Sequence, residues 1–190
     1  MSGGGPDRAA LAAAVRALLA AMGPAIRGED VSATPERVAD LWAGELLAGY
    51  ATDPLDCLAW DPAGESKSLV VVKDIAFTST CLHHLLPFSG RAAVAYLPGD
   101  RLCGLSKLVR VVTALSARLQ IQERLTMQTL RAVETALQPR GAAVLCSAVH
   151  ECMSCRGVRQ TGASVVTTAF GGDCAREPLR GEVLALMTPR

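Results

Sequence analysis

All three histidines of this 190-residue chain lie in two short motifs that also contain cysteine. The first motif reads Cys81-Leu82-His83-His84, and the second reads His150-Glu151-Cys152. Thiolate and imidazole are the ligands that zinc prefers, so two such motifs in a histidine-poor chain predict a metal site. The fold is therefore expected to bring together two segments that are distant in the sequence.

The spacing leaves open which histidine of the first motif would bind the metal. His150 and Cys152 are two residues apart in a predicted strand, so their side chains should share a face. An extended first motif would place Cys81 beside His83, whereas a turn would bring Cys81 to His84. In either case one histidine binds and its neighbour stays free for proton transfer. Three protein ligands and a water are typical of catalytic zinc.

Cys155 supports a competing interpretation of the same segment. It forms a Cys152-x-x-Cys155 pair and could supply a fourth ligand, which would make the zinc site closed and structural. The other four cysteines are expected to be small core residues: Cys57, Cys103, Cys146 and Cys174. An odd number of cysteines and the lack of a signal-peptide pattern favour reduced thiols and a cytoplasmic location.

Composition limits the possible partners. Half of the residues are hydrophobic, which is enough for a sizeable core. The net charge is only +1, and the aromatic residues are two Trp, two Tyr and three Phe. Neither nucleic acid nor a membrane is therefore an expected partner, because both require strong basic, aromatic or long apolar surfaces.

The apolar periodicity predicts helices and strands in an order typical of an α+β domain. We assign residues 1–50 to an N-terminal tail (1–6) and helical segment, with Thr34 as a helix N-cap, and residues 51–190 to the catalytic domain. Two strand pairs flank two helices, which predicts an antiparallel sheet covered on one face. The expected helices are 7–22, 34–47, a helix from Ser106, 122–137 and 177–187; the expected strands are 68–77, 91–97, 142–152 and 163–170.

Cations and a carboxylate accompany the metal motifs. Lys107 and Arg110 are three residues apart at the start of a predicted helix, an arrangement that suits a phosphate group. Arg156 follows the second metal motif and adds a guanidinium. Glu123 could accept hydrogen bonds from a nucleobase. For each of these residues the alternative is an ordinary solvated surface position.

Five motifs lie between Thr34 and Gly157, and the resemblance that they carry covers roughly residues 30 to 187. They are Thr34-Pro35-x-Arg37-Val38, Cys81-x-His83-His84, Gly104-Leu105-Ser106-Lys107-Leu108-x-Arg110, Arg118-Leu119-Gln120-x-Gln122-Glu123-Arg124-Leu125-Thr126 and His150-x-Cys152-Met153-x-x-Arg156-Gly157. In residue type and spacing this set resembles the GTP cyclohydrolase I family. The resemblance implies a T-fold (tunnelling fold) and a homodecamer of two pentameric rings, with active sites at subunit interfaces. The implied reaction converts GTP and water to 7,8-dihydroneopterin triphosphate and formate for pterin biosynthesis, with Zn²⁺ as cofactor.

The resemblance also implies a role for each site residue. The zinc ligands would be Cys81, His84 and Cys152. His83 and His150 would move protons during ring opening, and Ser106 would assist the opening of the ribose. The remaining residues would bind GTP: Gln122 and Glu123 at the guanine edge, and Lys107, Arg110, Arg156 and, from a neighbouring subunit, Arg37 on the triphosphate.

This chain departs from the family pattern at several positions. Leu82 stands where the family has Glu, which removes a carboxylate from the pocket wall, and Cys155 stands where the family has an apolar residue. Between Ala163 and Ala169, where the family is rich in Ser and Thr, the residues Ala163, Val165, Val166 and Ala169 dilute the hydroxyl-bearing side chains. Two alternatives therefore stay open. One is a related T-fold enzyme that acts on another purine nucleotide or stops at the ring-opened formamide. The other is a non-catalytic protein with a closed zinc site.

Overall fold

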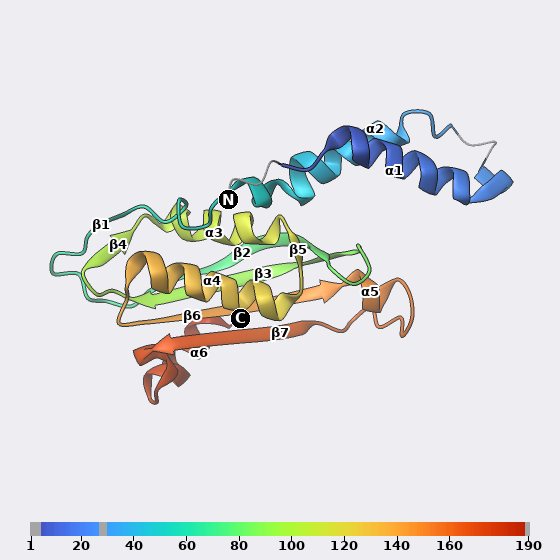
Figure 1. The fold of residues 1–190 in the computed structure, drawn as a ribbon. Coiled ribbons are helices and arrows are strands. Elements are labelled where there is room, and N and C mark those ends of the chain that lie inside the picture. The colour runs from blue at the N-terminus through green and yellow to red at the C-terminus, as the bar shows by residue number, and fades with distance from the viewer. Residues whose placement is uncertain (1–4, 27–29, 189–190) are drawn as a thin grey trace.

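A five-stranded sheet forms the centre of the fold (Figure 1). The computed structural model describes residues 5–26 and 30–188. Within the sheet, the four long strands pair antiparallel, and the short edge strand β5 pairs parallel with β2. In spatial order the strands are β5 (Leu119–Gln120), β2 (Val70–Cys81), β3 (Pro87–Leu97), β6 (Gly141–His150) and β7 (Val165–Gly172).

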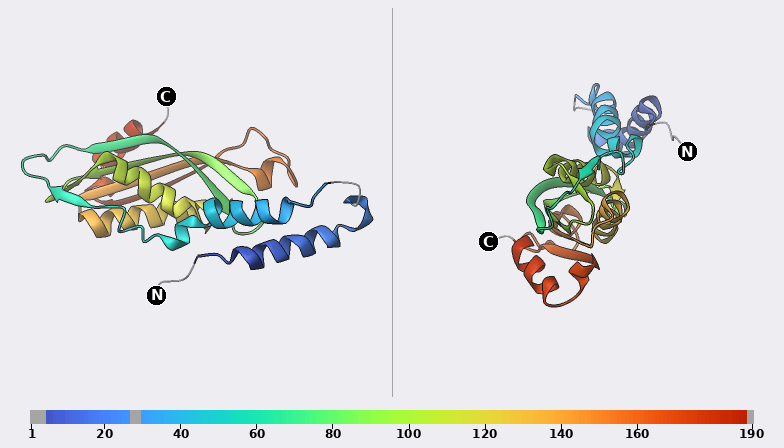
Figure 2. Two further views of the ribbon diagram at one scale, coloured as in Figure 1. Left: turned by 90° about the horizontal axis from the view of Figure 1, so that it is seen from above. Right: turned by 90° about the vertical axis from the view of Figure 1, so that its left-hand side faces the viewer.

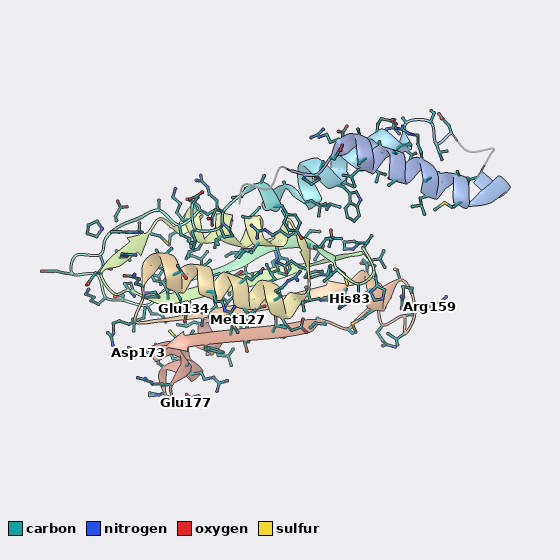
Figure 3. The ribbon with its side chains drawn as sticks, viewed as in Figure 1. His83, Met127, Glu134, Arg159, Asp173 and Glu177 are labelled. Atoms are coloured by element: carbon teal, nitrogen blue, oxygen red, sulfur yellow. The ribbon has the colours of Figure 1, made fainter. Side chains whose placement is uncertain are left out.

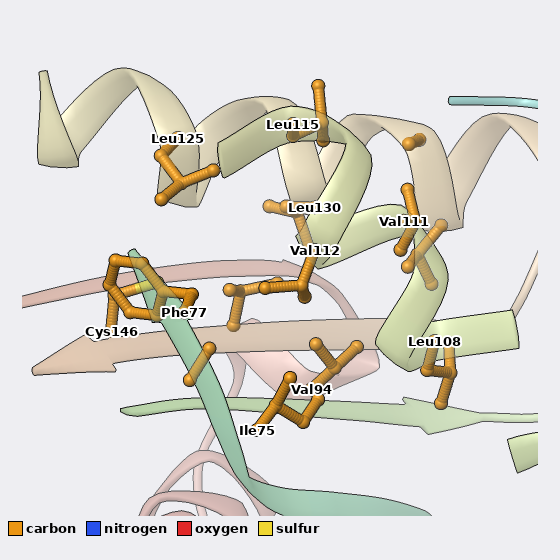
Figure 4. Packing of buried hydrophobic residues seen from close by; sticks show 14 of the residues in the cluster. Ile75, Phe77, Val94, Leu108, Val111, Val112, Leu115, Leu125, Leu130 and Cys146 are labelled. Carbon is orange, nitrogen blue, oxygen red and sulfur yellow. The ribbon is translucent and has the colours of Figure 1, made fainter. Parts of the chain in front are cut away.

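Two amphipathic helices cover one face of this sheet. These are α3 (Leu105–Ser116) and α4 (Gln122–Leu137), and their apolar faces pack on alternate strand residues such as Val94 (Figure 4). The predicted α3 stripe is buried: Leu108, Val111, Val112 and Leu115 are at most 2% exposed. The predicted α+β T-fold, with two helices on one face of an antiparallel sheet, is confirmed.

A last helix packs against the opposite face of the sheet (Figure 2). Helix α6 (Leu179–Met187) buries Val183 and Met187 in a second core with residues of β3 and β6 such as Ala143. It begins two residues later than predicted, because Pro178 lies at its N-cap and disfavours helical backbone at the preceding residue, Glu177. α6 covers the end of the sheet that is distant from α5 (Glu151–Ser154).

The N-terminal helices project from the sheet as a pair (Figures 1 and 2). Helix α1 (Arg8–Ala21) is capped by the Asp7 side chain, and it packs on α2 (Thr34–Leu41), which continues as a π-helical turn over Trp42–Leu46. Salt bridges join the two helices at their exposed edges, from Arg8 to Asp40 and from Arg16 to Glu36. Of the predicted tail at residues 1–6, residues 1–4 lie outside the described part.

The prediction of Thr34 as an N-cap is wrong by one position. Ala33 already has helical backbone angles, with φ −92° and ψ −3°, and it is the N-cap, although its side chain makes no capping hydrogen bond. The Thr34 N–H donates to the carbonyl of Val31, so a turn precedes the helix and moves its start. Thr34 and Pro35 are therefore both helical.

A two-stranded ribbon lies in a region that was predicted as connection. Strand β1 (Trp60–Pro62) pairs antiparallel with β4 (Arg101–Cys103) beyond the end of β3. A short 3₁₀ turn over Ala48–Ala51 precedes it. Strands of three residues contain too few alternations to give a periodic signal, so the sequence pattern could not predict them. None of the described helices is both long and apolar enough to cross a membrane.

Candidate metal centre

A tight loop between β2 and β3 determines which histidine lies beside Cys81. The Cys81 N–H donates to the Leu86 carbonyl at 2.8 Å, and the Leu85 N–H donates to the Cys81 carbonyl at 2.9 Å. Leu85 has a left-handed φ of +56°, which closes this turn. The chain therefore curls, and His84 Nδ1 comes within 3.8 Å of Cys81 Sγ. Of the two geometries left open by the spacing, the turn is the one observed.

The second motif lies at the end of a strand, and Cys152 is not in that strand. β6 ends at His150, and Cys152 lies in the short helix α5. The expectation that His150 and Cys152 share one face of a strand is therefore wrong. The cause is the ladder between β3 and β6, whose last pair is Phe88 with His150. Beyond this pair β3 turns into its loop, so the backbone of β6 has no partner with which to stay extended.

The two motifs meet at one end of the sheet. The ligand atoms of Cys81, His84 and Cys152 lie within 4.8 Å of one another. Cys81 is buried, Cys152 is half-buried and His84 is exposed, so the group is open on one side. Two sulfur donors and one imidazole fit Zn²⁺, which binds this donor set in tetrahedral geometry with room for a fourth ligand.

The electrostatics of the two thiols also favour a cation. Burial raises the pKa of the Cys152 thiol, and the adjacent Cys81 thiol raises it further, while the Arg156 guanidinium opposes both effects. Two thiolates in contact repel each other unless a positive ion lies between them, so a bound metal would remove the cost of ionising the pair.

Cys155 lies outside the group of donor atoms. Within the part of the chain that the structure describes, this group consists of Cys81, His84 and Cys152, and the Cys155 side chain is exposed. The proposed Cys152-x-x-Cys155 chelate is therefore not formed, and the geometry gives no fourth protein ligand from Cys155. The arrangement is that of an open site.

His83 lies beside the ligands without joining them. Its ring is exposed and lies edge-on to the His84 ring, with the centroids 6.2 Å apart and the planes at 84°. Figure 3 shows His83 at the same end of the sheet as Arg159, and Asp173 and Glu177 at the other end. Leu82 is 43% exposed in the same loop, and its backbone N–H donates to the Gln120 carbonyl. A free imidazole next to a metal-binding group is suited to carrying protons.

His150 is held by an aromatic ring and by a buried amide. Its imidazole stacks on Phe88, with the centroids 4.5 Å apart and the planes within 6°. Its Nε2 lies 2.8 Å from Oε1 of Gln122, whose side chain is 1% exposed. Burial lowers the pKa of His150, and the nearby Glu123 carboxylate partly offsets this shift.

Gln122 and Glu123, adjacent at the start of α4, have different environments. The Gln122 amide points into the protein and is hydrogen-bonded there, so it has no N–H left for a base. The Glu123 side chain is exposed close to His150 and has no salt-bridge partner among the described residues. Of the two residues predicted to read a purine edge, only Glu123 is free to do so in this chain.

The cations of α3 are not brought to the metal-binding group within one chain. The Cys103 N–H, just before α3, donates to the Tyr96 hydroxyl, and Tyr96 pairs with Val70 at the far end of β2. At about 3.3 Å per strand residue, this end lies roughly 35 Å from Cys81. Within one chain, Ser106, Lys107 and Arg110 therefore lie at the end of the sheet opposite the metal-binding group, and their predicted roles at the substrate stay predictions. The motif that follows Gly104 in the sequence does not reveal that the start of α3 and the metal-binding group lie at opposite ends of the sheet.

The two other predicted cations have different surroundings. Arg156 is exposed two residues after the end of α5, and its charge partly offsets the rise in the pKa of the Cys152 thiol. Arg37 is exposed on α2, within the helical pair that projects from the sheet. One predicted phosphate ligand therefore accompanies the metal-binding group, and the others lie elsewhere on the same chain.

Three further residues of the site were not predicted from the sequence. Phe88 supports the His150 ring, and Thr126 and Thr167 hydrogen-bond to each other at 2.6 Å beneath Gln122. Thr126 lies four residues after Gln122, so helical periodicity could have indicated that it shares a face with Gln122. Phe88 and Thr167 gave no such signal, because their roles depend on strand register.

Comparison with known proteins supports the family resemblance. The sequence model of the family described as GTP cyclohydrolase I matches residues 11–188. The protein "GTP cyclohydrolase 1" of Rhodopirellula baltica is 43% identical over 182 residues, which cover 95% of this chain and 79% of the relative. The protein of the same name from Leifsonia xyli is 43% identical over 187 residues, covering 96% of each chain. That from Deinococcus radiodurans is 45% identical over 164 residues, covering 86% of this chain and 76% of the relative.

Among solved structures, the archaeosine synthase QueF-Like in its apo form aligns with a TM-score of 0.47 and 21% identity. The alignment covers 57% of this chain and 97% of that one.

Proposed function

The chain belongs to the GTP cyclohydrolase I family, and we propose that it is a zinc-dependent hydrolase that converts GTP to 7,8-dihydroneopterin triphosphate and formate. The observation that carries this proposal is the open donor group of Cys81, His84 and Cys152, with His83 and His150 beside it. These three residues would hold Zn²⁺, which when bound supplies a Lewis acid and lowers the pKa of a coordinated water to about 7.

The residues around the donor group have the chemistry for the remaining steps. Opening the imidazole ring of GTP and releasing formate both require protons to move at ring nitrogens, and we assign these transfers to His83 and His150. The Glu123 carboxylate would accept hydrogen bonds from N1–H and the amino group of guanine, which only a guanine edge donates together. Arg156 would contact the triphosphate near Cys152.

We further propose that the active site is completed by a second copy of this chain. Ser106, Lys107 and Arg110 lie at the end of the sheet opposite the metal-binding group, so one chain cannot place them on the same GTP. The exposed edge of β7 and the projecting helices, which carry Arg37, are surfaces through which copies could associate. A homodecamer with interfacial sites, as the resemblance implies, would satisfy this requirement. The proposed location is the cytoplasm, in keeping with seven unpaired cysteines.

Leu82 supports a second candidate function. Its apolar side chain is exposed in the metal-binding loop, where the family has a carboxylate, so polar contacts to the substrate are reduced. An enzyme that acts on another purine nucleotide, or that stops at the ring-opened formamide, would have a similar donor group with altered substrate contacts.

The test is to incubate the zinc-loaded protein with GTP and to identify the products by mass spectrometry. Formate together with dihydroneopterin triphosphate supports the proposal. A ring-opened formamide alone supports the second candidate and places the defect after the first hydrolysis. If GTP is unchanged while zinc is bound, GTP is not the substrate, and other purine nucleotides are tested in the same assay.

A further inference from the structure

The orientation of the buried Gln122 amide is fixed by its acceptors. The Nε2 atom lies 3.0 Å from the Cys146 carbonyl oxygen and 2.9 Å from the Val165 carbonyl oxygen. Carbonyl oxygens only accept hydrogen bonds, so the atom that faces both must be the NH₂ group. A flipped amide would place oxygen against two oxygens in a buried position. The Oε1 atom of Gln122 therefore faces His150.

Two threonines are ordered in a way that agrees with this orientation. The Thr126 hydroxyl lies 2.9 Å from the Gln122 backbone carbonyl and must donate to it. With that proton used, the 2.6 Å contact between Thr126 and Thr167 requires Thr167 to donate. Thr167 then presents a lone pair to Gln122 Nε2, 3.1 Å away. Every donor in this network has an acceptor, which leaves the Gln122 amide no alternative arrangement.

The position of the proton on His150 follows from the amide. His150 Nε2 lies 2.8 Å from Gln122 Oε1, and an amide oxygen cannot donate, so Nε2 must be the donor. Stacking on Phe88 holds the ring plane and keeps Nε2 directed at Gln122. We propose that Gln122 is a positioning residue that keeps a proton on His150 Nε2, so that whenever the ring is neutral the lone pair lies on Nδ1.

This inference deepens the proposed function at a defined step. The use of Nδ1 as a proton acceptor rests on that function, whereas the tautomer itself rests only on the network. With its proton held at Nε2, His150 must first accept a proton at Nδ1 before it can give one back. Gln122 then acts through His150 and does not contact the guanine.

The tautomer is measured directly by magic-angle-spinning ¹⁵N NMR of zinc-loaded protein labelled at its three histidines. The His150 signals are assigned by their loss in His150→Phe. A protonated Nε2 and an unprotonated Nδ1 in the wild type support the proposal, and the reverse pattern overturns it. In Gln122→Met, which lacks the acceptor, the pure Nε2–H tautomer should give way to a mixture or to Nδ1–H. An unchanged tautomer would show that Gln122 does not set it.

Gln128→Met serves as the matched control, since Gln128 lies on the same helix and bonds Gln120 instead of His150. It should leave the tautomer unchanged.

If Gln122→Met does not fold, neutron diffraction from wild-type crystals locates the deuterium on His150 and the amide deuteriums on Gln122. In turnover assays Gln122→Met should lower kcat roughly 10²-fold, within the range for loss of acid–base catalysis, with little change in KM. A wild-type protein that shows the Nε2–H tautomer but does not turn over GTP would refute the proposed function and leave the tautomer assignment intact.

Discussion

The rings of Phe88 and His150 lie parallel across the last residue pair of the β3–β6 ladder, 4.5 Å apart. Beyond this pair the strands separate: β3 leads into the loop that carries His84 and reaches Cys81 at the end of β2, and β6 leads into α5 with Cys152. The same strand ends therefore place both halves of the metal-binding group and support the histidine beside it.

Replacing Phe88 by Leu should loosen His150 while keeping the fold. Phe88 is 1% exposed and also meets Phe77 edge-on, so the smaller side chain should cost roughly 1–2 kcal/mol of unfolding free energy. The value of kcat should fall even under conditions in which the variant stays fully folded, because the His150 ring loses the ring on which it stacks. Urea unfolding and kcat are measured together. Phe170→Leu, on β7 away from the site, is the control. Unchanged kcat in Phe88→Leu would show that stacking is dispensable.

Cys81→Ser or Cys152→Ser should abolish stoichiometric zinc binding, whereas Cys155→Ser should not affect it. The first two changes remove a soft donor from a three-ligand group, and the third changes an exposed side chain outside that group. Zinc content is determined by elemental analysis after dialysis, with circular dichroism as the test of folding. Zinc loss in Cys155→Ser would contradict the open three-ligand site and revive the closed alternative.

Features of this site that depend on residues close together in the sequence could be predicted, and features that depend on residues far apart in the sequence could not. The periodicity of residues 122–137 gave α4 with its observed bounds, because sixteen residues repeat one pattern. The end of β6 at His150 could not be predicted, since it depends on where β3 turns away. The spacing alone could not choose between His83 and His84; the family resemblance implied His84, and the left-handed Leu85 closes the turn that brings it to Cys81. The separation of Lys107 from Cys81 depends on the whole length of β2. Local sequence patterns therefore predicted the helices, the strands and the types of metal-donor side chain. The strand pairing and the tertiary fold determine which of these side chains lie together.

The folded protein should lose stability in alkali through Tyr96. Burial is the main cause that raises the pKa of Tyr96 from 10.0 to about 12. Because the folded pKa is the higher one, this contribution is fully present below pH 10 and is lost as the pH rises towards 12. At about 1.4 kcal/mol per pKa unit, the loss approaches roughly 3 kcal/mol.

Tyr96→Phe should be less stable at pH 8, because the Cys103 N–H loses its acceptor, and it should show a shallower decline between pH 10 and 12. Tyr50→Phe, at a residue that is 51% exposed, provides the comparison. Chemical unfolding at a series of pH values measures both effects. Equal slopes in the wild type and in Tyr96→Phe would rule out Tyr96 as the source.

Co-expression of two inactive variants should restore activity if the site combines two chains. Lys107→Ala removes a cation at one end of the sheet, and Cys152→Ser removes a metal ligand at the other, so each homo-oligomer should lack turnover. In a mixed assembly, sites that draw the α3 end from one subunit and the metal-binding group from another are intact with a probability of about one in four. Differently tagged subunits are co-expressed, purified through both tags and assayed with GTP. Lys107→Ala together with Ser106→Ala provides the matched control, because both changes lie at the same end and every site then carries one of them, so no site should be intact. Activity no greater than that of the separate variants would mean that Lys107 does not act across a subunit interface. Lys107 would then have no role in the reaction, because roughly 35 Å along β2 separates its end of the sheet from the metal-binding group.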